Sequence, residues 1–223
     1  MKRLSALALA FLLSGCSLTL PFAGPTQKVE YYVLASPVSA AREMAPPRIG
    51  VMPLSMPGYL TRPQLVVREA DGVNIRVLDF DRWGEEIGQG MSRVLCDALA
   101  AEGISAVPLR TGSQVDAKLM LDVRRFDGSL DGVVMLDTVW TIQKGKTVYQ
   151  SGHTVKELPC GDSLESMVET QSRLVQELAR DIARSMNCYK MMLLTGSKED
   201  STLEFYRRAG YNSEDKTAFV QWL

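Results

Sequence analysis

AKLMLDV, residues 117–123, is the stretch that decides the fold. Its apolar residues alternate with Lys118 and Asp122, which is typical of a strand with one buried face. The run VVMLDTVWTI at 133–142 is nearly all apolar and predicts a central strand of the same sheet. A turn at Lys144-Gly145 then leads to a further strand over 147–155. These segments predict an antiparallel meander.

Helical patterns flank this meander on both sides. Apolar residues recur at helical spacing over residues 83–102, where Gly103 follows as a C-cap. A second pattern covers residues 163–186, with Asp162 or Ser163 as N-cap and Glu165 placed for a capping box. One helix before the meander and one after it predict an α/β domain, in which a mixed sheet carries two main helices.

Shorter strands are expected elsewhere in the chain. Asp71-Gly72 is a strong hairpin signal between two of them. The predicted short strands cover residues 31–34, 49–54, 64–68, 74–78 and 104–109.

The first sixteen residues have the parts of a secretion signal. Met1-Lys2-Arg3 is positive, residues 4–13 are apolar, and Ser14-Gly15 precedes Cys16. The apolar run is too short to span a bilayer, which takes about 20 residues. Leu13 to Cys16 resembles the bacterial lipobox, so we expect cleavage after residue 15 and lipidation of Cys16. The alternative is an ordinary signal peptide followed by a chance cysteine.

Composition excludes several classes of function. The formal net charge is −1 and no basic cluster is present, so we expect no nucleic-acid partner. His153 is the only histidine, and no Cys-x-x-Cys pair occurs, so the sequence predicts no metal centre, no cofactor and no catalytic residue. In an oxidising compartment Cys96 and Cys160 are the candidate disulfide pair; buried free thiols are the alternative.

The chain from about Tyr31 to Met186 resembles the auxiliary lipoproteins of ABC-type transport systems, the PqiC-like family of Pqi/MCE lipid transport. The resemblance rests on the order and spacing of several blocks. These are Tyr31-Tyr32-Val33-Leu34, Ile49-Gly50-Val51, the run from Pro57 to Val66, Arg82-Trp83-Gly84-Glu85, and Arg125-Phe126-Asp127-Gly128.

This resemblance implies a three-layer α/β domain and a role without catalysis. The implied protein is held by lipid in the outer membrane and faces the periplasm, and Ser17 after the cysteine resembles the outer-membrane sorting pattern. Its implied partners are an inner-membrane permease and MCE-domain proteins that move lipid or another apolar solute, with a homo-oligomer also open. Pro57, Gly58, Tyr59 and Leu60 form the candidate partner-contact loop; the alternative is that Tyr59 and Leu60 enter the core.

The end of the chain does not fit this pattern. Residues 188–223, including Phe205-Tyr206 and Gly210-Tyr211, resemble the C-terminal strand-helix-strand of GNAT N-acetyltransferases. The glycine-rich loop that would hold the pyrophosphate of acetyl-CoA is missing, so we expect no acetyltransferase activity. We expect an incomplete domain that packs weakly.

The sequence therefore divides into a signal peptide (1–15), a tether (16–28), an auxiliary lipoprotein domain (29–187) and a GNAT-like tail (188–223). A structural envelope lipoprotein without a transport partner and an acetyltransferase fragment remain the alternative functions.

Overall fold

The structure is a computed structural model, and it describes residues 27–37, 46–110, 112–186 and 199–208. Its larger sheet has the strand order β5-β2-β6-β7-β8. The strands of this sheet are β2 (Arg48–Val51), β5 (Ser105–Pro108), β6 (Ala117–Gly128), β7 (Val133–Lys144) and β8 (Thr147–Pro159). β2 is parallel to both β5 and β6, whereas β6, β7 and β8 form the predicted antiparallel meander. The sheet is therefore mixed, as the sequence predicted.

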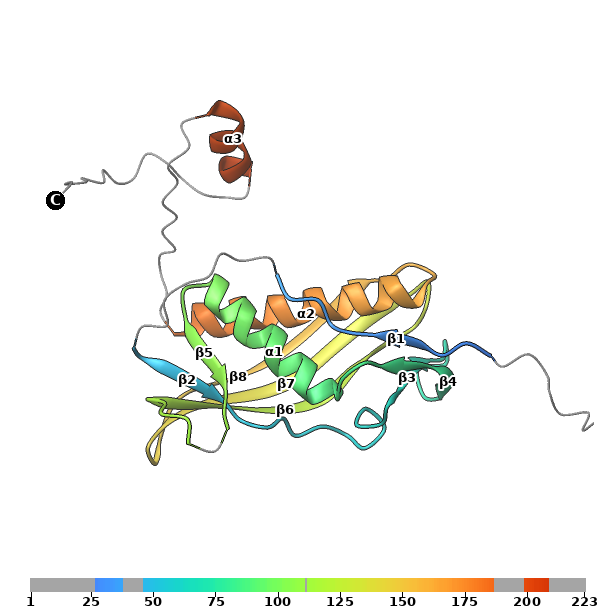
Figure 1. The fold of residues 1–223 in the computed structure, drawn as a ribbon, viewed down its shortest axis with the longest axis horizontal. Helices are drawn as coiled ribbons and strands as arrows, with labels where there is room; N and C mark the ends of the chain where they lie inside the picture. Colours follow the sequence, from blue (N-terminus) through green and yellow to red (C-terminus); the bar gives the residue numbers. More distant parts are fainter. Residues whose placement is uncertain (1–26, 38–45, 111, 187–198, 209–223) are drawn as a thin grey trace, which may run out of the picture.

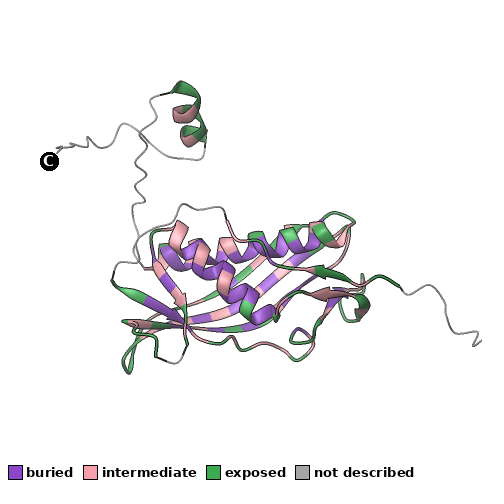
Figure 2. Cartoon of the chain, viewed as in Figure 1, coloured by how far each residue is buried: buried purple, intermediate pink, exposed green. Residues whose placement is uncertain are grey.

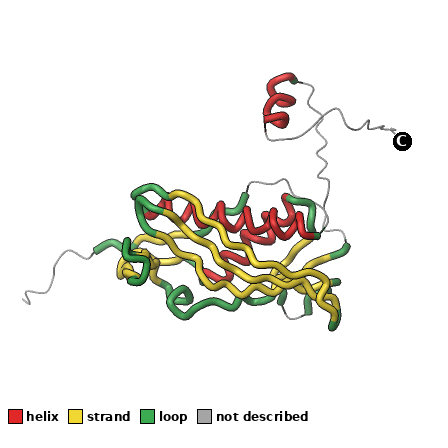
Figure 3. Tube along the Cα trace, turned by 180° about the vertical axis from the view of Figure 1, so that it is seen from behind, coloured by secondary structure: helices red, strands yellow, loops and turns green. Residues whose placement is uncertain are grey.

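Two helices cover one face of this sheet (Figure 1). They are α1 (Ile87–Ala101) and α2 (Leu164–Ser185). Along β7 the side chains of one face are buried beneath them: Val134, Leu136, Thr138, Trp140 and Ile142. The core lies between helices and sheet (Figure 2), and among the described residues no helix covers the opposite face (Figure 3). The α/β class with a mixed sheet and two main helices is confirmed. Within the described residues, however, the main sheet and its helices form two layers and not the three that the resemblance implied (Figure 1 and Figure 3).

A second, three-stranded sheet lies at one end of the domain (Figure 1). It contains β1 (Glu30–Tyr32), β4 (Ile75–Trp83) and β3 (Gln64–Arg68), in that order. β1 is parallel to β4, and β3 is antiparallel to it.

The first helix begins later than its apolar pattern predicted. β4 continues to Trp83, which lies opposite Tyr32 in the parallel pair, and α1 starts at Ile87 instead of residue 83. The backbone N–H of Trp83 donates to Pro63 at 2.7 Å, and that of Gly84 donates to Tyr32 at 2.8 Å. These long-range hydrogen bonds hold the segment extended, so the predicted start was wrong.

The second helix has the predicted bounds and one of its two candidate caps. The hydroxyl of Ser163 accepts from the backbone N–H of Ser166 at 3.2 Å. Because Ser163, and not Asp162, is the cap, Glu165 stands too early for a capping box and only complements the helix dipole.

Of the GNAT-like tail, the structure describes only Glu199 and one helix. This helix, α3 (Asp200–Arg208), buries none of its residues and lies apart from the α/β domain (Figure 1). The expected weak packing of residues 188–223 stays a prediction. The two predicted strands of the tail, and Cys188, lie outside the described residues.

Candidate functional site

The most buried charge of the domain is Asp127, near the end of β6. It is 0 % exposed, although it is acidic. Arg68 on β3 donates to it through Nε at 2.6 Å and through Nη2 at 2.8 Å. Arg125 donates from Nε at 3.0 Å, and the Tyr59 hydroxyl donates at 2.5 Å. Asp127 therefore accepts four hydrogen bonds, as a buried carboxylate requires.

These contacts fix the ionisation of the cluster. Burial opposes the charged form of Asp127, but the hydrogen bonds from Arg68, Tyr59 and Arg125 outweigh it and hold its pKa below the ordinary value. Burial and the neighbouring carboxylate raise the pKa of Tyr59, so its hydroxyl stays a donor. The cluster is an ion-pair network that connects the three-stranded sheet at the end of the domain, called the end sheet below, to β6. Residues of two sequence blocks meet in it: the run from Pro57 to Val66 and the block from Arg125 to Gly128.

The same cluster shows how the candidate contact loop, Pro57 to Leu60, is packed. Leu60 is 4 % exposed and belongs to the core. Tyr59 packs against the core, with the Arg68 guanidinium 5.9 Å from its ring centroid. Pro57 accepts from the backbone N–H of Leu60 at 2.9 Å and forms the turn, which leaves Gly58 exposed. Leu60 therefore lies in the core and the half-buried Tyr59 packs against it, in line with the alternative for these two side chains.

A second polar cluster fixes the segment that follows β1. Arg93 on α1 donates to the Leu34 carbonyl at 2.8 Å, to the Ser36 hydroxyl at 2.8 Å and to Glu85 at 2.5 Å. Asp97, one helical turn along, accepts from Ser36 at 2.5 Å.

The second helix completes this arrangement. The Ser172 hydroxyl of α2 accepts from the Ala35 backbone N–H at 3.0 Å, and the Leu34 side chain is 1 % exposed in the core. We call residues 34–36 with their partners Arg93, Asp97 and Ser172 the N-terminal clamp. Sequence reasoning missed it, because its partners are far apart in the chain and no local pattern marks them.

The uncovered face of the main sheet has a shallow groove of about 610 Å³. The chain after β2 runs beside β6 here, where the Ser55 N–H donates to Leu121 at 3.1 Å and the Val123 N–H donates to Ser55 at 2.9 Å. The groove mixes apolar and hydroxyl groups and is lined by Met52, Pro53, Ser55, Met120, Leu121, Asp122, Val139 and Thr141. Its apolar side chains suit apolar contact.

His153 lies on this same sheet, where its Nε2 is 2.8 Å from the Asp137 carboxylate. Both side chains are partly exposed, at 49 % and 27 %. The pair is a cross-strand contact between β7 and β8.

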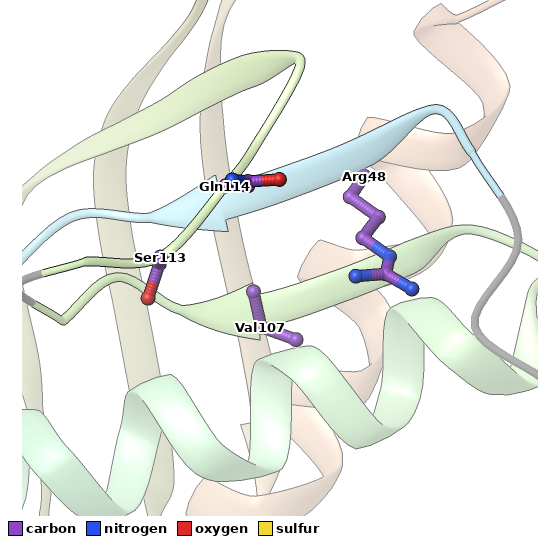
Figure 4. Close-up of a pocket in the computed structure, with 4 residues that line it drawn as sticks. All are labelled: Arg48, Val107, Ser113 and Gln114. Atoms are coloured by element: carbon purple, nitrogen blue, oxygen red, sulfur yellow. The ribbon is translucent and has the colours of Figure 1, made fainter.

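A second shallow cavity, of about 360 Å³, lies where β2 and β5 run side by side. Its lining residues are Arg48, Val107, Ser113 and Gln114 (Figure 4). The Arg48 backbone N–H donates to Asp116 at 2.7 Å, which ties the start of β2 to the chain before β6.

The predicted Cys96–Cys160 disulfide is not formed. Both are free, buried thiols, so the alternative of free thiols holds for these residues. Cys96 lies within α1, where burial and Asp97 raise its pKa to about 12. Cys160 follows β8, and its Sγ donates to the Gly161 carbonyl at 3.1 Å. The two thiols are not paired, although both belong to the hydrophobic core.

Neither a metal site nor a membrane span is found within the described residues. There is no group of three or more His, Cys, Asp or Glu that could hold a metal ion. No helix there is both long and apolar enough to cross a bilayer. The expected lipidation site, Cys16, and the expected signal peptide, 1–15, lie outside the described residues.

The domain is thus an α/β scaffold whose polar clusters serve its own structure. It is matched over residues 32–183 by the family of ABC-type transport auxiliary lipoprotein components. The chain belongs to this family, as its sequence blocks predicted. Its class is that of a lipoprotein component of the cell envelope.

Solved structures share the fold. A crystal structure of an uncharacterised protein is 20 % identical, with a TM-score of 0.62, and the match covers 72 % of this chain and 99 % of that one. A protein from Xanthomonas campestris is 15 % identical, with a TM-score of 0.54, over 74 % of this chain and 100 % of its own. At these identities the likeness concerns the fold alone. No curated protein matches the chain.

Proposed function

We propose that this chain is the lipid-anchored, outer-membrane component of a trans-envelope transport system of the Pqi/MCE type. In this role it serves the passage of lipid or another apolar solute and acts as a docking or binding component without catalysis. Its partners are an MCE-domain protein and an inner-membrane permease of the same system.

The N-terminal clamp is the observation that carries this proposal. A lipid on Cys16 is useful to a docking protein only if the anchor is firmly joined to the folded domain. The clamp makes that joint, since residues 34–36 are held by both main helices. Family membership supplies the transport context.

The chemistry of the described residues supports a role without catalysis. Its charged clusters are ion pairs, and the most buried carboxylate, Asp127, is fully enclosed. We therefore expect that acetyl-CoA leaves the Tm of the purified chain unchanged. A concentration-dependent rise in Tm would instead support the acetyltransferase alternative.

Membrane fractionation with intact-mass spectrometry tests the anchor. The wild-type chain should appear in the outer-membrane fraction as residues 16–223 carrying lipid. Cys16→Ala should abolish the lipid mass and release the chain from that fraction. Ser17→Asp should move the lipidated chain to the inner membrane, and Ser17→Thr is its matched control.

Cross-linking in whole cells followed by affinity isolation tests the docking role. We expect the MCE-domain protein with the wild-type chain and its loss with Cys16→Ala. Equal recovery with the unlipidated variant would contradict docking at the membrane. A lipidated chain that recovers no transport partner would favour a structural envelope lipoprotein.

A further inference from the structure

The outer face of the end sheet carries exposed apolar side chains. Tyr31 is 66 % exposed, Val33 is 56 % exposed and Phe80 is 39 % exposed. Side chains of this size are usually buried, and three of them on two adjacent segments mark an interaction surface.

The strand register puts polar and apolar groups on opposite faces. Tyr32 and Trp83 lie opposite one another and pack against the core, so they define the inner face. The pair two residues earlier, Glu30 and Asp81, lies on the same inner face because strand side chains alternate. Asp81 also accepts a hydrogen bond from the Tyr32 hydroxyl at 3.4 Å.

Tyr31 is paired with Arg82 on the other, outer face. Phe80, two residues before Arg82, and Val33, two residues after Tyr31, continue this face by the alternation of strand side chains. The acidic residues of the paired strands therefore point away from a face that combines apolar groups with one arginine.

Gly84 keeps this face flat. It follows Trp83 and lies beside Val33, because a Cβ built on Gly84 would be 3.0 Å from Val33 Cγ1 and 4.0 Å from Tyr31 Cβ. A side chain there would stand over the apolar residues. We call the surface made by Tyr31, Val33, Phe80 and Arg82 the β1 face.

We propose that the β1 face lies against the surface of the bilayer that holds the lipid on Cys16. The inference rests on the proposed function, since it requires the lipid anchor. It adds the orientation of the domain: the end sheet faces the membrane, and the β7–β8 hairpin at the other end of the domain faces the periplasm (Figure 1).

The length of chain between the lipid and the β1 face argues that this face lies against the bilayer. Thirteen residue steps separate Cys16 from Val29, which directly precedes β1. Even a fully extended chain of that length spans only about 45 Å. The β1 face is thus the part of the domain nearest to the anchor along the chain.

Such tethering makes a weak surface contact effective. A short link between two binding groups gives the second group a local concentration on the order of millimolar. Three apolar side chains would not hold a free protein on a membrane, but they can orient one that is already held by lipid.

The side chains suit the membrane–water boundary. A tyrosine ring is apolar with a polar end, so it favours that boundary. An arginine beside it can extend its guanidinium toward lipid phosphates while its stem stays among apolar groups. A second copy of this chain or a partner protein would also cover an apolar face, and the experiment distinguishes these occupants.

Photo-crosslinking of the full lipidated chain tests the orientation. The chain is reconstituted in vesicles of phosphatidylethanolamine and phosphatidylglycerol, with p-benzoylphenylalanine replacing one tyrosine. Tyr31 is the test position. Tyr149, near the β7–β8 hairpin, is the matched control, because it is a tyrosine of similar exposure, 62 %. Phe80 serves as a second position on the β1 face.

Intact mass after illumination gives the result. We expect the mass of one phospholipid to be added at Tyr31 and at Phe80, and none at Tyr149. Equal lipid adducts at Tyr31 and Tyr149, or a cross-linked dimer at Tyr31 in place of a lipid adduct, would overturn the proposal.

The same spectrum separates the two proposals. If the chain carries lipid on Cys16 and Tyr31 gives no phospholipid adduct, the orientation is wrong and the anchor stands. If Cys16 carries no lipid, the proposed function itself fails.

Discussion

Arg68 and Asp127 form a two-pronged ion pair, with Nε donating to Oδ1 at 2.6 Å and Nη2 donating to Oδ2 at 2.8 Å. The pair joins β3 of the end sheet to β6 of the main sheet, across a gap of 59 residues in the chain. The planar guanidinium matches the carboxylate in both position and angle. The two sheets are therefore held in a fixed relation at this point.

Removal of the buried carboxylate is expected to destabilise the domain strongly. Asp127→Ala leaves Arg68, which is 13 % exposed, without its anion, and breaking a buried pair in this way costs about 3–5 kcal/mol. The free energy of unfolding in urea measures the loss. Asp122→Ala, at an exposed site on the same strand, is the control and should change stability by about 0.5 kcal/mol or less.

The same carboxylate predicts the acid response of the domain. The pKa of Asp127 is lowered in the folded state, so its stabilising contribution is complete above the unfolded-state value of about 4. That contribution is lost as the pH decreases through the lower folded-state pKa. Urea unfolding from pH 7 to pH 2 should show this decrease in the wild type and a weaker one in Asp127→Asn. Identical pH profiles would contradict the prediction.

Gly152 is expected to tolerate no side chain. A Cβ on Gly152 would lie 2.3 Å from Cζ2 of Trp140, whose indole N–H donates to Thr154 at 3.2 Å. Gly152→Ala should therefore cost about 1–3 kcal/mol by overpacking. Gly58→Ala is the control, because a Cβ at Gly58 meets nothing within 4 Å. Thermal unfolding of the two variants should separate them by several degrees.

The N-terminal clamp should open locally when Arg93 is removed. Arg93→Ala deletes the donors to the Leu34 carbonyl and the Ser36 hydroxyl, so the backbone near Ala35 should exchange its amide hydrogens faster. Each hydrogen bond of this kind contributes about 0.5–1.5 kcal/mol. Hydrogen–deuterium exchange at residues 34–36 measures the effect. Arg76→Ala, which removes an exposed pair with Glu69, should leave these amides unchanged.

Local patterns predicted the meander and both main helices, because their apolar periodicity reflects burial on one face. The start of α1 was wrong because Trp83 is held extended by pairing with β1, a contact that no local window contains. The ion pair between Asp127 and Arg68 could not be predicted from local sequence either, since its two partners are distant in the chain. The sequence signal for this ion pair was the block Arg125 to Gly128, one of those on which the family resemblance rests. The partner of Tyr59 could not be predicted for the same reason, because Asp127 is far from it in the chain.

The parallel pairing of β1 with β4 has a mechanical consequence. A chain held at one end by lipid experiences tension whenever the domain is pulled away from the membrane. Tension along β1 acts on all of its hydrogen bonds to β4 at the same time. These bonds must therefore break together and not one after another. Beyond β1, the buried Leu34 side chain and the clamp would pass the force to α1 and α2, because Arg93 and Ser172 belong to these helices. For the proposed lipid anchor, β1 and the N-terminal clamp would therefore resist shear, with the packed core behind them.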